Sequence, residues 1–539
     1  MELNRREFLQ LSIGTGIAIG VFRRPIQEVL SADHPLPVKQ WSVGQEDFFI
    51  SQCSFCKNSC GFLCRVVDGN LVRIEGNPQS PVNRGSLCPA GISGVQHLYH
   101  PDRILQPLKR TGAKGNFHFT KTTWDDALAL IRNTLNSKTP HPKIAWVNDG
   151  STGPLLNSYL HSLLEKLGEV HWLEAQSDPM GILLKHIQSV EEVEYDLENA
   201  RTILSFGYPL FEGGKYPISF MRIFGRRIDT NPFHLIQAEP RFSLTASRAQ
   251  VWIPLAPNQE GSFALALANV FIREEWYNAD FIQRFTSDFD EFRNWLLTSW
   301  TLEELAGACR VPVEKIFSVA RTLAQGQPSI VIPGEHLFYQ KNGFFTVWAV
   351  YLLNALIGNI GKTGGVLRPL PHPLAPSFAP PRKEPSKVSP DVVFLGEYDS
   401  FFVGNNPELL ALVKNAPFVV QITSMLNDTS AYADLVLPLC TFGETYQENY
   451  LTPFGEQIIA VAPPFRAPQG ESLPVYEIVR KIVASGDADL EKEDFSVYLD
   501  RQLRRLYTLG RGTPFGSDED IQSIRSMQER GWWYPVEPD

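Results

Sequence analysis

The chain has 539 residues and an ordinary globular composition, with 43% hydrophobic and 20% charged residues. This length exceeds what one simple hydrophobic core needs and predicts two to four domains. The formal net charge of -10 argues against nucleic acid as a partner, because phosphate backbones attract basic surfaces.

The N-terminus has the pattern of a twin-arginine export signal. The motif NRREFL at residues 4–9 leads into a mildly apolar, glycine-rich run that ends at Phe22. This run is too short to predict a membrane span. A small-x-small cleavage site is not evident, since Leu30 stands two residues before Ala32. We therefore expect export by the twin-arginine route, to the periplasm or the outer face of the cytoplasmic membrane, with an N-terminus that could remain as an anchor.

Four cysteines form the most informative pattern of the chain. Cys53, Cys56 and Cys60 lie in one short stretch, and Cys88 follows after a longer one. Four thiolates with this spacing can enclose a [4Fe-4S] cluster. Zinc sites usually present two ligand pairs separated by a spacer, so the pattern favours iron–sulfur over zinc. Disulfides are a further alternative in an exported chain.

The other cysteines of the chain are interpreted as small buried hydrophobic residues. Cys64 lies in a predicted strand, and Cys309 and Cys440 lie in apolar stretches. A second strand is expected at residues 71–76, after the turn at residues 68–70. The cysteine loops should therefore lie on a small β-rich unit.

Short apolar runs alternate with helical patterns through most of the remaining chain. The first long helix is expected near Thr123, which can cap it with Asp126 at the third position. Alternation of this kind predicts parallel sheets with helices on both faces. The first series of runs is 143–147, 155–167, 202–206, 218–228 and 233–238, and the second is 329–332, 345–357, 392–395, 400–403 and 418–422.

The predicted fold is α/β, with a small β-rich iron–sulfur domain and two α/β lobes that contain mainly parallel sheets. A proline-dense stretch is expected to cross between the lobes as a loop. The predicted boundaries are 1–40 for the signal and linker, 41–115 for the iron–sulfur domain, 116–367 for the first lobe, 368–390 for the crossing loop, 391–485 for the second lobe and 486–539 for a helical tail.

The residues around the cysteines resemble the iron–sulfur domain of the molybdopterin oxidoreductase family, the DMSO reductase superfamily of bis-pterin guanine dinucleotide enzymes. The similarity is carried by residues 66–78, 81–88, 99–103 and 124–127. Polysulfide and thiosulfate reductases are similar members, as are the molybdopterin-like subunits of alternative complex III and of menaquinone reductase. The resemblance implies a [4Fe-4S] cluster and, as a possibility, molybdopterin guanine dinucleotide with molybdenum or tungsten.

Later segments resemble the cofactor-binding lobes of this family, in which glycine-rich strand ends hold the two dinucleotide halves. Ligands of open α/β sheets bind at the carboxyl ends of strands, which agrees with this resemblance. Taken alone, such glycines and asparagines simply make turns. The residues that the resemblance implies in pterin or nucleotide binding are Gly207, Glu239, Arg241, Glu260, Gly364, Asn406 and Asp428.

The chain departs from the family at the metal ligand. Relatives place a Cys, selenocysteine, Ser or Asp in a stretch that corresponds here to residues 170–180, which contain no cysteine. Ser177 and Asp178 are the candidate oxygen ligands and the candidate catalytic residues, with His171 and Glu174 as polar neighbours. A Ser-Asp-Pro turn is the commoner meaning of such residues.

Other departures bear on whether the pterin site is complete. Pro89 and Ala90 stand where many relatives carry Lys or Arg beside the fourth cysteine, and Tyr208 stands where relatives often carry Asn. The family's C-terminal β-barrel domain, which closes over the pterins, is expected to be absent. A cleft open on one side cannot exclude water from reactive chemistry.

These features lead to one main functional expectation. The chain should be an exported iron–sulfur subunit of a membrane-associated respiratory oxidoreductase complex, which transfers electrons through one cluster and lacks its own metal-pterin substrate site. Expected partners are a ferredoxin-like iron–sulfur subunit, a quinone-binding membrane subunit and, as a possibility, a separate barrel-domain chain. The alternative is an active molybdenum or tungsten reductase of the polysulfide or thiosulfate type, completed by a partner chain. A non-redox structural subunit is a minor alternative.

Overall fold

The computed structural model describes residues 44–56, 58–137, 141–148, 150, 152–175, 178–190, 192–369, 384–397, 406–484, 494–508 and 532–533. Two units are distinguished, Met1–Asp47 with Val66–Asn70, and Phe48–Arg65 with Leu71–Asp539. Within the first, the backbones of Gln45 and Asp68 are tied by a hydrogen bond of 3.0 Å from the Asp68 N–H to the Gln45 carbonyl. Asp68 and Gly69 both have positive φ, which confirms the predicted turn.

A three-stranded sheet carries the cysteine region, in the order β1 (Glu46–Gln52), β2 (Gly61–Val67) and β3 (Asn70–Gly76). Cys64 on β2 is fully buried, as its apolar surroundings predicted. Two short helices, α3 (Pro89–Ile92) and α4 (Gly94–Leu98), follow Cys88. This is the small β-rich unit expected from the sequence.

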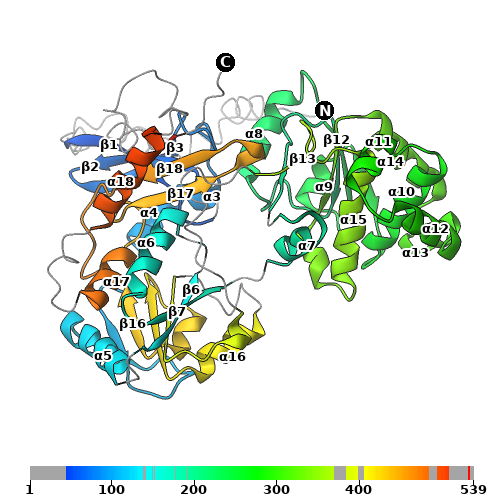
Figure 1. Ribbon diagram of the computed structural model, residues 1–539. Coiled ribbons are helices and arrows are strands. Elements are labelled where there is room, and N and C mark those ends of the chain that lie inside the picture. The colour runs from blue at the N-terminus through cyan, green and yellow to red at the C-terminus, as the bar shows by residue number, and fades with distance from the viewer. Residues whose placement is uncertain are drawn as a thin grey trace, which may run out of the picture. The chain divides into compact units, whose positions relative to one another are not determined.

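A seven-stranded sheet joins two distant parts of the chain, in the order β5-β4-β16-β15-β14-β6-β7. In Figure 1 the cyan strands β6 and β7 lie beside yellow β16 and its neighbours. The five strands from β16 to β7 are parallel, and their near-continuous apolar sequences suit strands buried on both faces. The bounds are β4 (Leu108–Arg110), β5 (Phe119–Lys121), β6 (Lys143–Asn148), β7 (Glu169–Glu174), β14 (Val392–Leu395), β15 (Phe418–Thr423) and β16 (Leu435–Pro438).

Helices cover both faces of this sheet. One face packs Trp146 and Phe394 against four helices, and the other packs Val393 against Leu409 and its neighbours. The first of these helices begins as predicted, because the Thr123 hydroxyl accepts the Asp126 N–H at 3.1 Å. The covering helices are α5 (Trp124–Asn136), α6 (Pro154–Leu164), α17 (Val475–Val483) and α18 (Phe495–Thr508) on one face and α16 (Pro407–Asn415) on the other.

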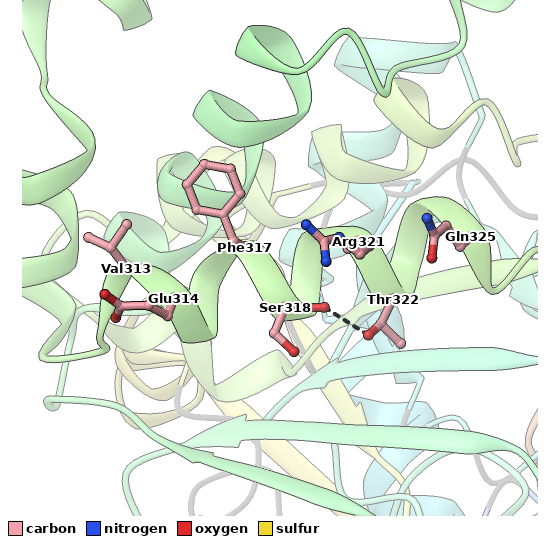
Figure 2. A pocket seen from close by; sticks show the side chains of 7 residues that line it. All are labelled: Val313, Glu314, Phe317, Ser318, Arg321, Thr322 and Gln325. Carbon is pink, nitrogen blue, oxygen red and sulfur yellow. Dashed lines mark hydrogen bonds between the residues drawn. The ribbon is translucent and has the colours of Figure 1, made fainter.

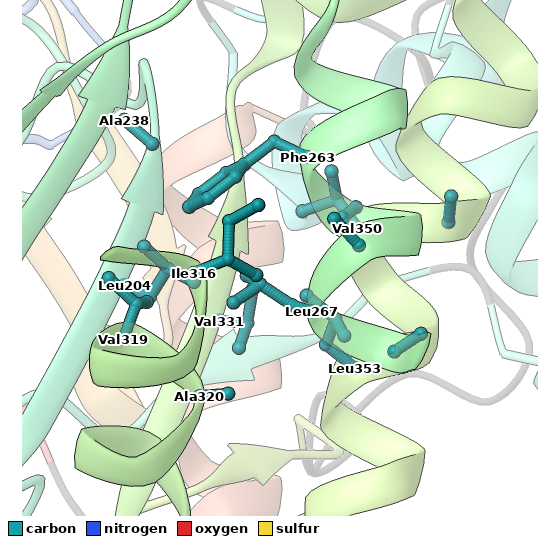
Figure 3. Close-up of a cluster of buried hydrophobic side chains, with 14 of the residues drawn as sticks. Leu204, Ala238, Phe263, Leu267, Ile316, Val319, Ala320, Val331, Val350 and Leu353 are labelled. Carbon is teal, nitrogen blue, oxygen red and sulfur yellow. The ribbon is translucent and has the colours of Figure 1, made fainter. Parts of the chain in front are cut away.

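A four-stranded parallel sheet has the order β11 (Val251–Pro254), β10 (His234–Glu239), β9 (Thr202–Phe206) and β12 (Ser329–Pro333). On one face Leu204 and Val331 pack with Phe263, Ile316 and Val350, as Figure 3 shows. These residues come from α10 (Glu260–Arg273), α14 (Val313–Gln325) and α15 (Gly343–Ile357), and α8 (Pro217–Arg227) covers the other face.

An asparagine side chain forms hydrogen bonds with backbone groups on the free edge of this sheet. Asn354 on α15 is fully buried, accepts the Val331 N–H at 2.9 Å and donates to the Val331 carbonyl at 2.8 Å. Val331 lies on the edge strand β12, whose outward backbone groups would otherwise be buried without partners. This pairing explains why a polar residue interrupts the apolar run of α15.

Shorter elements complete the described chain. β8 (Glu194–Tyr195) pairs antiparallel with β13 (Val366–Leu367), and β17 (Gln447–Leu451), β18 (Ile458–Ala462) and β19 (Trp532–Trp533) form an antiparallel sheet. Within the described ranges no sheet closes into a barrel, and no helix has the length and apolar character needed to cross a bilayer. The other helices are α7 (Pro179–Gln188), α9 (Leu244–Arg248), α11 (Ala279–Phe285), α12 (Phe289–Ser299), α13 (Leu302–Cys309), η1 (Glu335–Tyr339), η2 (Pro385–Lys387), η3 (Asp428–Tyr432) and η4 (Pro453–Gly455).

The predicted fold class is confirmed, but the sheets do not follow the predicted boundary between lobes. β6 and β7 were expected in the first lobe, yet β6 pairs in parallel with β14, from Ile144 opposite Val392 to Val147 opposite Leu395. The four-stranded sheet is therefore built from a segment inserted between β7 and β14. Apolar alternation identifies a strand but not its pairing partner. The export signal and the strand predicted at residues 400–403 lie outside the described residues.

Candidate iron–sulfur and cofactor sites

The four predicted cluster ligands lie on two loops, one between β1 and β2 and one before α3. The first loop is closed by a hydrogen bond of 2.9 Å from the Cys53 N–H to the Cys60 carbonyl. Buried Asn83 joins the loops, since its side chain accepts the Gly61 N–H at 2.8 Å and donates to the Gly61 and Ser86 carbonyls at 3.0 and 2.8 Å. Asn83 thereby holds the segment before Cys88 next to Gly61, the residue that follows Cys60.

The sulfur atoms of these four cysteines lie close enough to affect one another. Burial raises the pKa of the Cys53 thiol to about 12, and Cys56 and Cys88 add to the rise. Burial also raises the pKa of Cys60, and the other three cysteines reinforce it. For Cys64 burial alone raises the pKa to about 12. The structure thus brings the four predicted ligands together and leaves Cys64 outside the group.

This donor set fits a [4Fe-4S] cluster, which four cysteine thiolates hold. The Gly91 N–H lies 3.4 Å from the Cys88 sulfur, a hydrogen bond of the kind that stabilises negative charge on a ligand. Iron ions would replace the thiol protons that burial favours, because a bound cation inverts the local pKa order. In the described ranges no three His, Cys, Asp or Glu side chains are placed to hold a metal ion. The structural support for a cluster is therefore the set of four cysteine sulfurs that interact with one another.

Aromatic rings and a buried ion pair support the cysteine loop. Phe442 meets Phe55 and Phe62 edge-on, with ring centroids 6.4 and 5.7 Å apart. Arg103 binds Glu444 through two hydrogen bonds of 3.1 and 2.7 Å, and both side chains are buried. A bidentate pair in a buried setting is directional, and loss of one partner would leave an uncompensated charge. These contacts fix the cysteine region to the segment that follows β16.

The predicted metal-ligand stretch has a different role in the structure. Asp178 is exposed and is the N-cap residue of α7, where its carboxylate accepts the Gly181 N–H at 2.8 Å. Ser177 lies outside the described residues. His171 is buried within β7, and Glu174 at the end of that strand accepts Asn148 Nδ2 at 3.0 Å. The observed contact of Asp178 is therefore that of a residue in a turn that caps a helix.

Four of the predicted cofactor residues gather at the carboxyl end of the four-stranded sheet. Gly207 follows β9 with φ of +67°, and a Cβ there would overlap the His336 ring. His336 interacts electrostatically with Glu260, Glu239 and Arg241, and its burial lowers its pKa. Glu239 and Glu260 are buried, whereas Arg241 is largely exposed. Such an edge is where dinucleotides bind in open parallel sheets.

Sequence reasoning missed two residues of this edge, Gln237 and His336. Gln237 on β10 is fully buried, and neither polar atom of its side chain has a hydrogen-bond partner among the described residues. Gln237 lies on the same face of the strand as Glu239, which accepts a hydrogen bond from the Ser243 hydroxyl. Orphaned buried amides call for a ligand or a water molecule, so the edge fits a polar cofactor. The sequence signals were a glutamine inside an apolar strand and a histidine three residues after another strand.

The other three predicted cofactor residues lie elsewhere. Gly364 has φ of +73° and packs against Pro328 at the amino end of β12, where its N–H donates to Asp196 at 2.7 Å. Asn406 caps α16 by accepting the Leu409 N–H at 3.1 Å, and Asp428 begins η3 after β15. Gly364 thus serves a turn at the opposite end of the strands from Gly207.

A separate hollow of about 550 Å³ lies along α14 and is shown in Figure 2. Its lining comes from one helix, and the hydrogen bond drawn joins the Thr322 hydroxyl to the Ser318 carbonyl. The lining side chains do not include a cysteine, a histidine or a pair of carboxylates. This hollow therefore lacks the convergent chemistry of the two regions above.

An α/β protein with a four-cysteine region and a polar edge on a parallel sheet has the features of a redox protein that binds an iron–sulfur cluster and a dinucleotide. The chain belongs to the molybdopterin oxidoreductase family, whose main domain matches residues 103–485 and whose Fe4S4 domain matches residues 47–100. The predicted family is confirmed. Both the [4Fe-4S] cluster and the possible molybdopterin cofactor are supported by these matches.

Similar proteins include subunits of multi-subunit reductases. The chain is 26% identical to the thiosulfate reductase molybdopterin-containing subunit PhsA of Salmonella typhimurium, over 99% of this chain and 75% of that protein. It is also 26% identical to the menaquinone reductase molybdopterin-binding-like subunit of Nitratidesulfovibrio vulgaris, over 88% of this chain and 71% of that one. Acetylene hydratase from Pelobacter acetylenicus shares the fold, with a TM-score of 0.71 at 18% identity, over 91% of this chain and 75% of that chain.

Proposed function

We propose that this chain is an iron–sulfur subunit of a membrane-associated respiratory oxidoreductase complex, and that it transfers electrons without a metal-pterin substrate site of its own. The observation that carries the proposal is the contrast between two predicted metal sites. Four cysteines lie near enough to interact electrostatically, whereas Asp178, in the family's metal-ligand stretch, caps a helix. The similarity to a menaquinone reductase subunit described as molybdopterin-binding-like supports a role of this kind.

When bound, a [4Fe-4S] cluster takes up and releases single electrons. The chain's own residues hold it and set its surroundings. Cys53 and Cys60 are buried, Phe62 and Phe442 exclude water behind them, and the Gly91 N–H stabilises the Cys88 sulfur. Burial and hydrogen bonds to sulfur are the means by which a protein sets a cluster potential. Cys56 is exposed, which places the edge of the site within reach of a partner.

A second candidate is an active molybdenum or tungsten reductase completed by a partner chain. Two observations favour it, the orphaned Gln237 amide beside Glu239 and the similarity to a thiosulfate reductase subunit. Under this proposal Glu239, Glu260 and the strand end at Gly207 would hold part of a dinucleotide. The bound metal would supply atom-transfer chemistry, and the protein would supply orientation.

Metal and pterin analysis of the complex purified from its own host separates the two candidates. The electron-transfer subunit predicts about four iron atoms per chain, expected for one such cluster, with neither molybdenum nor tungsten and no guanine nucleotide. Molybdenum or tungsten with two guanine nucleotides per chain would sink this proposal and establish the second. A purified protein without the magnetic resonance signal of a reduced cluster would favour the structural alternative.

We further propose export by the twin-arginine route and association with a ferredoxin-like subunit and a quinone-binding membrane subunit, with a separate barrel-domain chain as a possible addition. The support is the arginine pair at the N-terminus and the similarity to reductase subunits. Replacing Arg5 and Arg6 by lysine should leave the folded protein in the cytoplasm, as fractionation would show. Normal export of that variant, or export only in an unfolded state, would contradict the proposed route.

A further inference from the structure

Two arginines meet where the loop before Cys88 packs on α8. The contact is anchored by the Ser219 hydroxyl, which donates to the Val82 carbonyl, and by the Tyr216 N–H, which donates to Asn58 Oδ1 at 2.7 Å. Arg84 lies two residues after Val82, and Arg222 lies three residues after Ser219. Arg84 and Arg226 both act on Arg222, whose pKa is lowered first by burial and then by these two cations. The fold therefore gathers three guanidinium groups, Arg84, Arg222 and Arg226, which we call the arginine surface.

The arginine surface is incompletely neutralised within the described part of the chain. Arg226 pairs with Glu198, but Arg84 and Arg222 have no carboxylate within 4.0 Å among the described residues. Nε of Arg222 is buried without a hydrogen-bond partner. The carboxylates that face this group are Glu198 and Glu456, with Asp196 beside Glu456.

Repulsion between these cations and strain in the backbone of Arg84 destabilise this part of the chain. Like charges at positions i and i+4 of a helix, such as Arg222 and Arg226, destabilise it, and of these two only Arg226 has a carboxylate partner, Glu198. Arg84 has φ of +40°, a backbone region that is strained for a non-glycine residue. Arg84 and Arg222, which have no carboxylate within 4.0 Å among the described residues, are therefore open to an anionic partner.

The surface of α8 beside these arginines is apolar and open. Met221 and Ile228 are 38% and 52% exposed, and no atom lies within 4 Å of a Cβ built at Gly225. These three residues follow one another at helical spacing, so they form a stripe next to Arg222 and Arg226. Methionine and arginine are enriched in protein interfaces, and a glycine allows close approach of another backbone. A small anion would need the arginines but not this stripe.

We propose that the arginine surface docks an acidic segment of the protein that exchanges electrons with this chain. Arg84 precedes Cys88 by four residues, so a partner held there lies next to a loop that carries a cluster ligand. The guanidinium fork matches a carboxylate in two hydrogen bonds. Arg84 and Arg222 are two guanidinium groups without a close carboxylate on a chain of net charge -10, which favours an acidic partner at this place. The inference rests on the proposed electron-transfer function for the nature of the partner.

Stopped-flow reduction of the cluster in the full, cluster-loaded chain tests this docking surface. The probe is an acidic plant-type [2Fe-2S] ferredoxin, with reduced methyl viologen as a small reductant. The second-order rate constant with ferredoxin should fall as ionic strength rises, and Arg84→Glu with Arg222→Glu should lower it at least tenfold at low ionic strength. The rate with methyl viologen should not fall in that variant. Arg248→Glu at the end of α9, an exposed arginine elsewhere, is the matched control and should behave as wild type.

The milder pair Arg84→Gln with Arg222→Gln covers the case in which charge reversal impairs folding, and it should lower the ferredoxin rate severalfold with full cluster content. Equal ferredoxin rates in this pair and in wild type would overturn the docking surface while leaving the electron-transfer function intact. Failure of both reductants to reduce the wild-type cluster would instead contradict the proposed function. Saturable binding of inorganic phosphate, lost in the glutamine pair and unaffected by removal of the apolar stripe in Met221→Ser, would show a small-anion site and overturn the protein partner.

Discussion

The cysteine loops and the turn between β7 and α7 were both predicted as metal-binding regions, and the structure gives them different chemistry. In the cysteine loops four sulfurs interact, and Asn83 ties the loops together with three hydrogen bonds. In the turn the carboxylate of Asp178 is exposed and accepts a backbone N–H of its own helix. A metal site needs several donors in one region and a framework that holds them, and of these two regions the cysteine loops have four interacting sulfurs and the Asn83 framework.

The largest expected effect tests the cysteine side of this comparison. Replacing Cys56 or Cys88 by serine should remove or convert the cluster, and the yield of folded protein should fall because metal binding and folding are coupled. Iron content and the magnetic resonance signal of the reduced protein measure the loss. Cys64→Ala is the control and should keep the cluster, because Cys64 does not interact with the other four. An unchanged four-iron signal in both serine variants would show that another group ligates the iron.

The cysteine site could be predicted from the sequence because its ligands are local. Three of them lie within eight residues, and the fourth lies on a loop that Asn83 fastens to the first. The spacing of these cysteines in the sequence is therefore enough to predict that they lie near one another. The polar edge of the four-stranded sheet is different, since Gly207, Glu239 and His336 lie at or just after the ends of three strands that are separate in the chain.

The pairing of strands from distant parts of the chain could not be predicted, for a related reason. Val392–Leu395 reads as a buried strand in any parallel sheet, and nothing in its sequence states that it pairs with β6 instead of β12. The roles of individual residues were partly readable. The Thr123 cap was predicted correctly from a local pattern, whereas Gln237 became visible only when the contacts of its side chain were known.

Asn83→Ala tests whether the framework of the cysteine loops matters apart from the ligands. The substitution removes three hydrogen bonds and leaves the Gly61 N–H without a partner in a buried place, whereas the Gly61 carbonyl keeps the Asn77 N–H at 2.9 Å. We expect the free energy of unfolding to fall by about 2–4 kcal/mol, measured by denaturant titration, with cluster content reduced but not abolished. Asn70→Ala removes an exposed asparagine of the same region and should have little effect. Equal stability of the two variants would contradict a framework role for Asn83.

Glu448 tests how the cysteine region is supported from β17. Its carboxylate is buried and accepts the Leu155 and Leu156 N–H groups at 3.0 and 3.4 Å, while the flanking Gln447 and Asn449 bond to Ser51 and Gln52 beside Cys53. Burial raises the pKa of Glu448 to about 8, well above its usual value near 4.5. The contribution of the protonated Glu448 side chain to the free energy of unfolding is therefore complete below pH 4.5 and is lost as the pH rises to about 8.

Glu448→Gln stays uncharged, so between pH 5 and pH 8 its free energy of unfolding should fall by about 3–4 kcal/mol less than that of wild type. Thermal unfolding at a series of pH values measures the difference, with Glu408→Gln at an exposed position of α16 as control. Parallel pH profiles for wild type and Glu448→Gln would show that the carboxyl ionises freely in the folded protein.

The smallest effect is expected for substitutions of Asp178, which test whether the turn between β7 and α7 binds a metal. As an N-cap, Asp178 is replaceable by asparagine, and Asp178→Ala should cost about 1 kcal/mol of stability. As a metal ligand it would not be replaceable by either residue, because a neutral amide is a poor substitute for a carboxylate. We expect Asp178→Asn to match wild type in stability, iron content and cluster signal. If the purified wild type contained molybdenum or tungsten and both variants lost it at unchanged stability, the turn would be a metal site after all, and the contrast with the cysteine loops would disappear.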